Sequence, residues 1–109
     1  MPVMAVVSIL HRISGVAMVL LIPLLVYLFD LSLRNPQGFQ TVLAVLNSTP
    51  VRLLEVLLVW MLAHHFFAGV RFLVLDMDWG VEKAVARKSA WLVHGAAVVT
   101  TLLIAGALL

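Results

Sequence analysis

Three long apolar blocks constrain this chain more than any other feature of its sequence. They run from about Ser8 to Leu33, from about Val51 to Asp76 and from about Ser89 to Leu109. Each block is long enough to cross a hydrocarbon core about 30 Å thick as a helix. Inside a bilayer no water satisfies the backbone groups, and three strands are too few to close a barrel. The sequence therefore predicts an all-α integral membrane protein with three transmembrane helices, in a single domain over residues 1–109.

The composition agrees with a membrane protein and narrows its chemistry. Of the 109 residues, 64% are hydrophobic and 11% are charged, whereas a soluble domain has about 25% charged residues. The chain has no cysteine, which excludes disulfides, iron–sulfur ligation and thiolate catalysis by its own residues. Its net charge of +2 comes from scattered basic residues, so no nucleic-acid partner is expected.

The ends of the blocks carry signals that predict the connections between them. Asp30 and Arg34 stand four residues apart at the exit of the first helix and are expected to pair. Ser89 is the expected N-cap of the third helix, and Pro23 predicts a bend in the first. A short segment between the first two blocks has apolar residues at the spacing typical of a helix on the membrane surface: Phe39, Val42, Leu43 and Leu46.

The distribution of basic residues predicts the orientation in the membrane. Only Arg34 and Arg52 fall on the side of the first connection. The other side carries Arg12, Arg71, Lys83, Arg87 and Lys88. Because basic residues are concentrated on the cytoplasmic side, the N-terminus and the second connection are expected there.

A polar cluster lies near the cytoplasmic end of the first helix. Ser8 and Arg12 are four residues apart and share a face, and His11 and Ser14 form the neighbouring stripe. One interpretation is that Arg12 reaches lipid phosphates while His11 sits at the interface. The other is a binding site, in which a hydroxyl, an imidazole and a guanidinium hold carbonyl or carboxylate oxygens. The residues alone leave both open.

The second helix contains two adjacent histidines, His64 and His65, which helical geometry turns about 100° apart. One flat cofactor therefore cannot be ligated by both. His65 shares its face with Gly69, which leaves space one turn away, as a planar macrocycle packed against a helix requires. Haem iron is commonly held by a neutral imidazole. The alternative is a hydrogen-bonded packing histidine, and this is the expectation for His94 in the third helix, which has no glycine one turn on.

Two segments together resemble the cytochrome b subunit of succinate dehydrogenase, one of the two membrane anchors of respiratory complex II. SILHRIS, Ser8 to Ser14, is similar to the family pattern S-x-x-H-R-x-S/T at every fixed position. HFFAGVRFLVLD, His65 to Asp76, is similar to H-x-x-x-G-x-R-H/F followed by apolar residues and Asp. Phe72 stands where many relatives have histidine. The three-helix topology with a cytoplasmic N-terminus also matches.

The resemblance implies a role for each matched position in a haem-containing bundle formed with a partner anchor subunit. His65 would be the axial ligand that this subunit gives to the iron of a b-type haem. His11 and Arg12 would lie near the haem propionates, and Gly69 would pack against the haem. Ser8 and Arg12 would also line the ubiquinone site.

The two remaining motif positions, Arg71 and Asp76, would support this site near the cytoplasmic face. No catalytic residue is expected, because the sequence has no nucleophile–base pair, phosphate loop or metalloprotease motif. On its own the chain would not be an enzyme.

The resemblance also implies partners and a process. The partners are a second membrane anchor, an iron–sulfur subunit, a flavoprotein subunit and membrane lipid. The process is electron transfer from succinate to ubiquinone, in the tricarboxylic acid cycle and aerobic electron transport, with a bacterial cytoplasmic (inner) membrane as the expected location. Two alternatives stay open: the anchor of a related fumarate reductase, and a cofactor-free structural or assembly membrane protein.

Overall fold

The computed structural model describes residues 2–109 and contains four α-helices. They are, in chain order, α1 (Val3–Arg34), α2 (Pro36–Asn47), α3 (Thr49–Asp76) and α4 (Lys83–Leu108). Residues 2–109 contain no β-strand. By length and composition, α1, α3 and α4 could each cross a membrane. The predicted all-α fold with three membrane-spanning helices is therefore confirmed.

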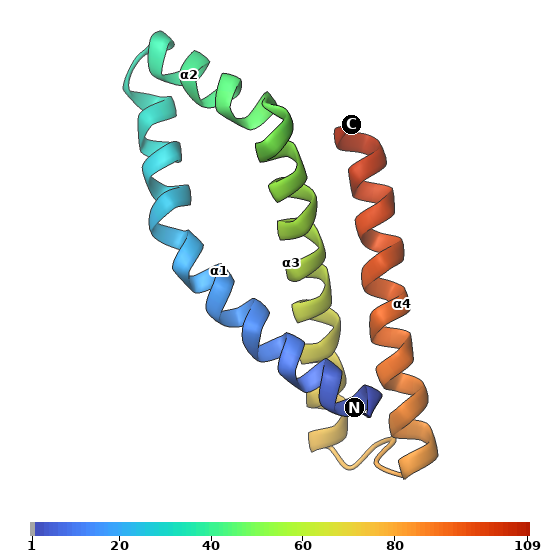
Figure 1. Cartoon of the computed structure of the whole chain (residues 1–109). Helices are drawn as coiled ribbons and strands as arrows, with labels where there is room; N and C mark the ends of the chain where they lie inside the picture. Colours follow the sequence, from blue (N-terminus) through green and yellow to red (C-terminus); the bar gives the residue numbers. More distant parts are fainter. Residues whose placement is uncertain (1) are drawn as a thin grey trace.

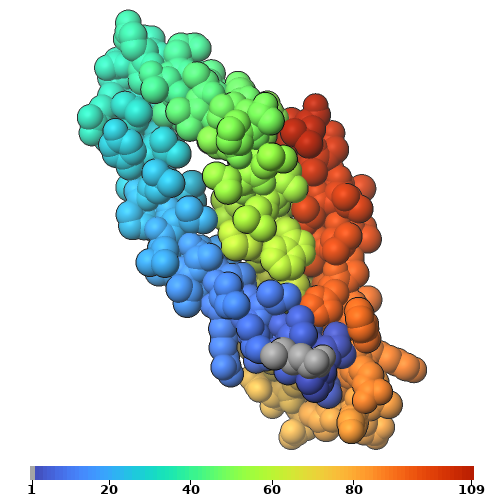
Figure 2. Space-filling view, viewed as in Figure 1, coloured from blue at the N-terminus to red at the C-terminus, as the bar shows by residue number. Residues whose placement is uncertain are grey.

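The three long helices run along the length of the molecule with α3 between α1 and α4 (Figure 1). The N-terminus and the α3–α4 connection lie at one end, and α2 and the C-terminus lie at the other. α1 meets α3 and α4 near its own start and diverges from α3 toward α2, which leaves a hollow between them (Figure 2). Pro23 lies inside α1, and the ribbon of α1 changes direction along its middle (Figure 1).

Small side chains close the packing where the three long helices meet. Val7 of α1, Ala68 of α3 and Ala90 of α4 are each fully buried, and Val93 joins them in one cluster. Small residues let helix backbones approach closely, which is how helices associate in a membrane. This cluster lies within one turn of the polar residues of α1 and α3, so it fixes how the two helices face each other.

The helix starts differ from the predicted ones at two places. α1 begins at Val3 rather than near Ser8, directly after Pro2, because residues 3–7 are all compatible with a helix. α4 begins at Lys83, so the prediction of Ser89 as its N-cap was wrong. The first turns of α4 contain the basic residues Lys83, Arg87 and Lys88, which form helices well but interrupt the apolar run. An apolar run marks only the part of a helix that lies in lipid. The Ser89 hydroxyl instead donates to the Ala86 carbonyl oxygen at 3.0 Å.

The connection between α1 and α3 contains the predicted amphipathic helix, α2. Asn35 caps it, since its Oδ1 accepts from the Gly38 amide at 2.6 Å, and Pro36 occupies the first turn, where proline is tolerated. Four apolar residues of α2 turn toward the last part of α1 and line a hollow there: Phe39, Val42, Leu43 and Leu46. α2 thereby spans the gap between the diverging helices.

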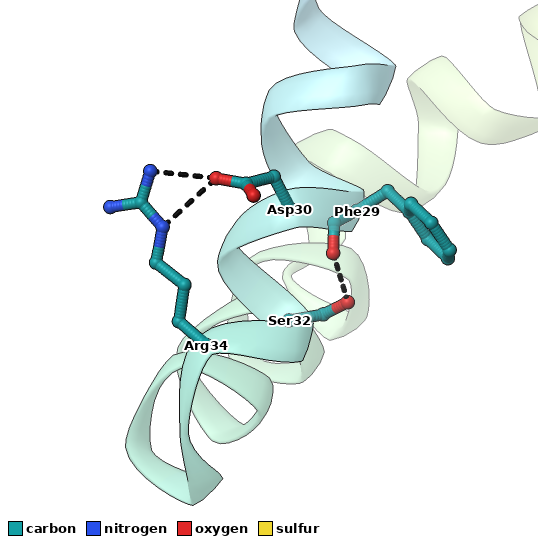
Figure 3. A network of polar contacts seen from close by, with 4 residues as sticks. All are labelled: Phe29, Asp30, Ser32 and Arg34. Carbon is teal, nitrogen blue, oxygen red and sulfur yellow. Dashed lines mark hydrogen bonds and ion pairs between the residues drawn. The ribbon is translucent and has the colours of Figure 1, made fainter.

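Polar contacts fix the end of the molecule that carries α2. Asp30 Oδ2 accepts from Arg34 Nη2 at 2.6 Å and from Arg34 Nε at 2.9 Å, which confirms the predicted pair (Figure 3). Arg52, at the start of α3, donates to the Leu108 carbonyl oxygen at 2.5 Å and to Asn47 Oδ1 at 2.8 Å. Arg52 therefore joins the ends of α2, α3 and α4.

Candidate functional site

The two adjacent histidines of α3 contact different helices, as their helical spacing predicts. His65 faces α1, where it contacts His11 and Ser14. His64 faces α4, where it contacts His94. The two adjacent histidines therefore lie in separate environments, one on each side of the central helix α3.

On the α1 side, His65 is held at one ring nitrogen. Its Nδ1 lies 3.1 Å from the His11 carbonyl oxygen and 3.1 Å from Ser14 Oγ. A carbonyl oxygen can only accept a hydrogen bond, so His65 Nδ1 carries the proton and donates. Ser14 also donates to that carbonyl, at 3.0 Å. In the neutral form of a ring protonated at Nδ1, the lone pair lies on Nε2, and this atom of His65 has no hydrogen-bond partner within residues 2–109.

Two glycines border the stacked rings of His11 and His65. The rings are nearly parallel, at 6°, with centroids 4.1 Å apart. A Cβ added to Gly15 would lie 3.1 Å from His65 Cε1, closer than side chains normally pack, whereas a Cβ on Gly69 would lie an ordinary 3.5 Å from His11 Nε2. Gly15 is therefore the glycine that makes room for His65. The sequence prediction missed it, although a glycine one turn after His11 in an apolar helix was a readable signal.

An apolar cavity of about 380 Å³ opens beside His65, between α1 and α3. Apart from His65 and Gly15, its walls are aliphatic, with Met18, Leu21, Ile22 and Leu25 from α1 and Leu58 and Leu62 from α3. The hollow between the two helices in Figure 2 lies in this region. An imidazole with an available lone pair at the edge of an apolar cavity suits a flat, apolar, metal-containing group.

Ser8 and Arg12 lie on α1 close to the start of the helix, one turn apart. Ser8 is half-buried and Arg12 is exposed. In the part of the chain that the structure describes, neither side chain has a hydrogen-bond partner. His11, between them in sequence, points to the α3 side, where Phe72 packs edge-on against its ring at 5.2 Å.

The two remaining motif residues lie away from the His11–His65 stack. Arg71 is buried on the α4 side, where its Nε donates to Ser89 Oγ at 2.9 Å and its Nη2 donates to the Ala86 carbonyl oxygen at 3.1 Å. Asp76 is the exposed last residue of α3. Arg71 therefore joins α3 to α4 and does not reach His65's neighbours on α1.

His64 is fully buried between α3 and α4. Its Nε2 lies 3.3 Å from Nδ1 of His94, and Trp60 packs against its ring at 5.3 Å. This confirms the expected interhelical hydrogen bond of His94. Nδ1 of His64 is buried without a partner among residues 2–109. The burial of His64 gives it no open space for a flat cofactor.

Fold and site together define an integral membrane protein with one histidine presented to an apolar cavity between its helices. The family model described as the succinate dehydrogenase/fumarate reductase transmembrane subunit matches residues 1–104. The chain belongs to this family. It is also 31% identical, over 93 residues, to the succinate dehydrogenase cytochrome b556 subunit of Coxiella burnetii, an alignment that covers 84% of this chain and 74% of the relative. The resemblance inferred from the two motifs is thereby confirmed, and with it a membrane-anchor subunit of the cytochrome b type.

Proposed function

We propose that this chain holds a b-type haem through His65 and supplies Ser8 and Arg12 to a ubiquinone site in succinate:quinone oxidoreductase. The observation that carries the proposal is the hydrogen bond from His65 Nδ1 to the His11 carbonyl oxygen. Histidines that ligate metals almost always donate their other ring N–H to a carbonyl, a carboxylate or water, which fixes the tautomer and the ring orientation. His65 meets this condition beside an apolar cavity.

The haem would be shared between two anchors. His65 would give one axial ligand from this chain, and the second would come from the partner anchor subunit. When bound, a b-type haem supplies a one-electron carrier within the membrane. This chain's residues position it: Gly15 leaves room for the His65 ring, Gly69 leaves room for the His11 ring, and aliphatic side chains exclude water.

The polar end of the site would bind charged and carbonyl oxygens. His11 and Arg12 lie at the end of α1 where the helices converge, so both would donate to haem propionates. Arg12 would contribute most, because cationic donors form the stronger hydrogen bonds to carboxylates. Ser8 and Arg12 present a hydroxyl and a guanidinium one turn apart. These donors would hold a quinone carbonyl oxygen and stabilise the negative charge that develops on it during reduction.

The reaction divides among the subunits of the assembly. The flavoprotein oxidises succinate to fumarate and releases two electrons and two protons. The iron–sulfur subunit carries the electrons, and ubiquinone takes up two electrons and two protons to become ubiquinol. This chain, with a second anchor subunit, contributes attachment to the membrane, half of the haem pocket and part of the quinone site. Arg71 would support it by joining α3 to α4 near their cytoplasmic ends, where Asp76 is the last residue of α3.

A paired substitution at the histidine doublet tests the ligand assignment. His65→Ala should abolish the b-type haem band in the reduced-minus-oxidised spectrum of the purified complex, expressed per bound flavin. His64→Leu, which places an apolar side chain of similar size in the α3–α4 interface, should retain the band. The opposite pattern would transfer the assignment to His64. A wild-type complex with no such band would favour the cofactor-free alternative.

The family covers both directions of catalysis, so a fumarate reductase anchor is the second candidate. Succinate oxidation is favoured because the matched relative is named as a succinate dehydrogenase subunit. Rates of ubiquinone-dependent succinate oxidation and of quinol-dependent fumarate reduction by the purified complex distinguish the two candidates. A faster fumarate reduction would select the second.

A further inference from the structure

Arg71 is a buried cation without an acidic partner. Only 8% of its surface is exposed, and its hydrogen-bond acceptors are the neutral Ser89 hydroxyl and Ala86 carbonyl. Within residues 2–109 the one ion pair joins Asp30 and Arg34, at the opposite end of α1 from its contact with α3 and α4. A buried charge without a counter-charge is costly. An anion from outside this chain would therefore be bound favourably at Arg71.

Arg71 also lines a groove that is separate from the cavity beside His65. The groove lies between α3 and α4, encloses about 430 Å³ and has apolar walls that include Phe67, Val74, Leu92 and Ala96. Its lining residues on α4 extend from Val85 to Ala96, which corresponds to about 16 Å along a helix. Arg71 supplies the charged group in this lining. The groove is thus long and apolar, with one cation on its wall.

The position of Arg71 along α3 places this cation near the membrane surface. α3 has 28 residues and is therefore about 42 Å long, which exceeds a hydrocarbon core of about 30 Å by about 6 Å at each end. Arg71 precedes the last residue, Asp76, by about 7.5 Å. It therefore lies close to the boundary between hydrocarbon and headgroups. Trp79 lines the same groove and is exposed, as is typical of tryptophans at this boundary.

We infer that this groove binds a phospholipid, with an acyl chain lying between α3 and α4 and a phosphate oxygen on the Arg71 guanidinium. A carboxylate side chain from a partner subunit would also neutralise Arg71, but it would leave the apolar length of the groove unfilled. An amphiphile matches both features at once. The inference uses none of the residues proposed to contact the haem or the quinone, because Arg71 lies on the α4 side of α3 and has only a supporting role in that site.

The test counts phospholipids that stay bound to the assembled complex. The complex is purified in a mild detergent, washed extensively and weighed intact by native mass spectrometry. Arg71→Gln removes the cation, and Ala96→Phe fills the groove while keeping Arg71. Each should lose one phospholipid per copy of this chain. Arg71→Lys keeps a positive charge and should retain it.

Two matched controls show whether a loss is specific to the groove. Lys88→Gln removes an exposed basic residue outside the groove, and Val98→Phe enlarges an exposed residue elsewhere on α4. Both should keep the wild-type number. Added phosphatidylglycerol should restore the missing mass to a delipidated wild-type complex, while diacylglycerol with the same chains should not.

Equal phospholipid numbers in wild type, Arg71→Gln and Ala96→Phe would overturn the inference. So would a wild-type complex that retains no phospholipid, which would leave a partner's carboxylate as the counter-ion of Arg71. Restoration by diacylglycerol as well would refute the phosphate contact. If Arg71→Gln does not assemble, Ala96→Phe and Arg71→Lys still decide the question.

Discussion

The imidazole of His65 lies flat against that of His11, with ring centroids 4.1 Å apart and planes at 6°. These residues stand 54 positions apart and belong to different motifs. The contact between α1 and α3 brings both motifs into one site. The same contact orients His65, because the His11 backbone carbonyl accepts its Nδ1–H. α1 therefore helps to position the proposed haem ligand that α3 provides.

Gly15→Ala should loosen the haem while leaving the complex assembled. The added Cβ would lie 3.1 Å from His65 Cε1, so the ring must shift away from α1. Overpacking of this kind costs about 1–3 kcal/mol, which should lower haem affinity by about 5- to 150-fold. The rate of haem transfer from the complex to a haem-scavenging protein measures this change.

Gly95→Ala is the matched control for that substitution. Gly95 also lies within a long helix, but an added Cβ there meets nothing within 4 Å. The haem transfer rate should stay at the wild-type value. A similar acceleration in both variants would mean that Gly15 acts on the stability of the helices and not on His65.

Ser14→Ala should weaken haem binding without abolishing it. Ser14 Oγ lies 3.1 Å from His65 Nδ1 and donates to the His11 carbonyl, so its loss leaves one of two contacts at Nδ1. Removal of such supporting groups typically costs about 10- to 100-fold in metal affinity, and the retained carbonyl favours the lower value. A changed midpoint potential of the haem should accompany it, since hydrogen bonding at Nδ1 tunes the ligand. Ser32→Ala, which loses a contact to its own helix at Phe29, should change neither quantity.

The sequence predicted the elements of this site better than their contacts. Helical periodicity separated His64 from His65, and the structure places them against different helices. Periodicity within one helix does not show which residue of another helix fills the space beside a glycine. The sequence accordingly did not show that the side chain nearest to a Cβ added at Gly69 is that of His11, and the packing of Gly69 against the haem stays a prediction.

The ends of the helices were harder to predict than their existence. An apolar run shows only the part of a helix that lies in lipid, and the helix can continue beyond that run. α4 therefore starts at Lys83, and Ser89 lies inside the helix. That extension is what lets Ser89 and Ala86 accept hydrogen bonds from Arg71. The contact of Arg71 with α4 was therefore not predicted, because hydropathy does not mark the residue at which α4 begins.

Ser8→Ala and Arg12→Ala should separate the two half-reactions of the complex. Each removes one donor from the proposed quinone site, where a hydrogen bond to a developing negative charge typically contributes about 2.7–4 kcal/mol. Ubiquinone reduction should fall by about 100-fold or more, while succinate oxidation with an artificial acceptor should stay at the wild-type rate. Equal loss of both activities would indicate failed assembly instead. The b-type haem content per flavin, measured on the same samples, checks that the haem pocket is intact.

The buried pair His64 and His94 predicts a non-additive effect on stability. His94→Leu removes the partner of His64 Nε2, and since His64 Nδ1 already has none among residues 2–109, the ring loses its hydrogen bond. An unsatisfied buried polar group costs about 1–3 kcal/mol, whereas replacing both partners with apolar groups of similar shape is nearly neutral. His64→Leu combined with His94→Leu should therefore give a complex more stable than His94→Leu alone. The temperature at which half of the quinone reductase activity survives a fixed incubation measures this, and a double variant less stable than both single variants would contradict the pairing.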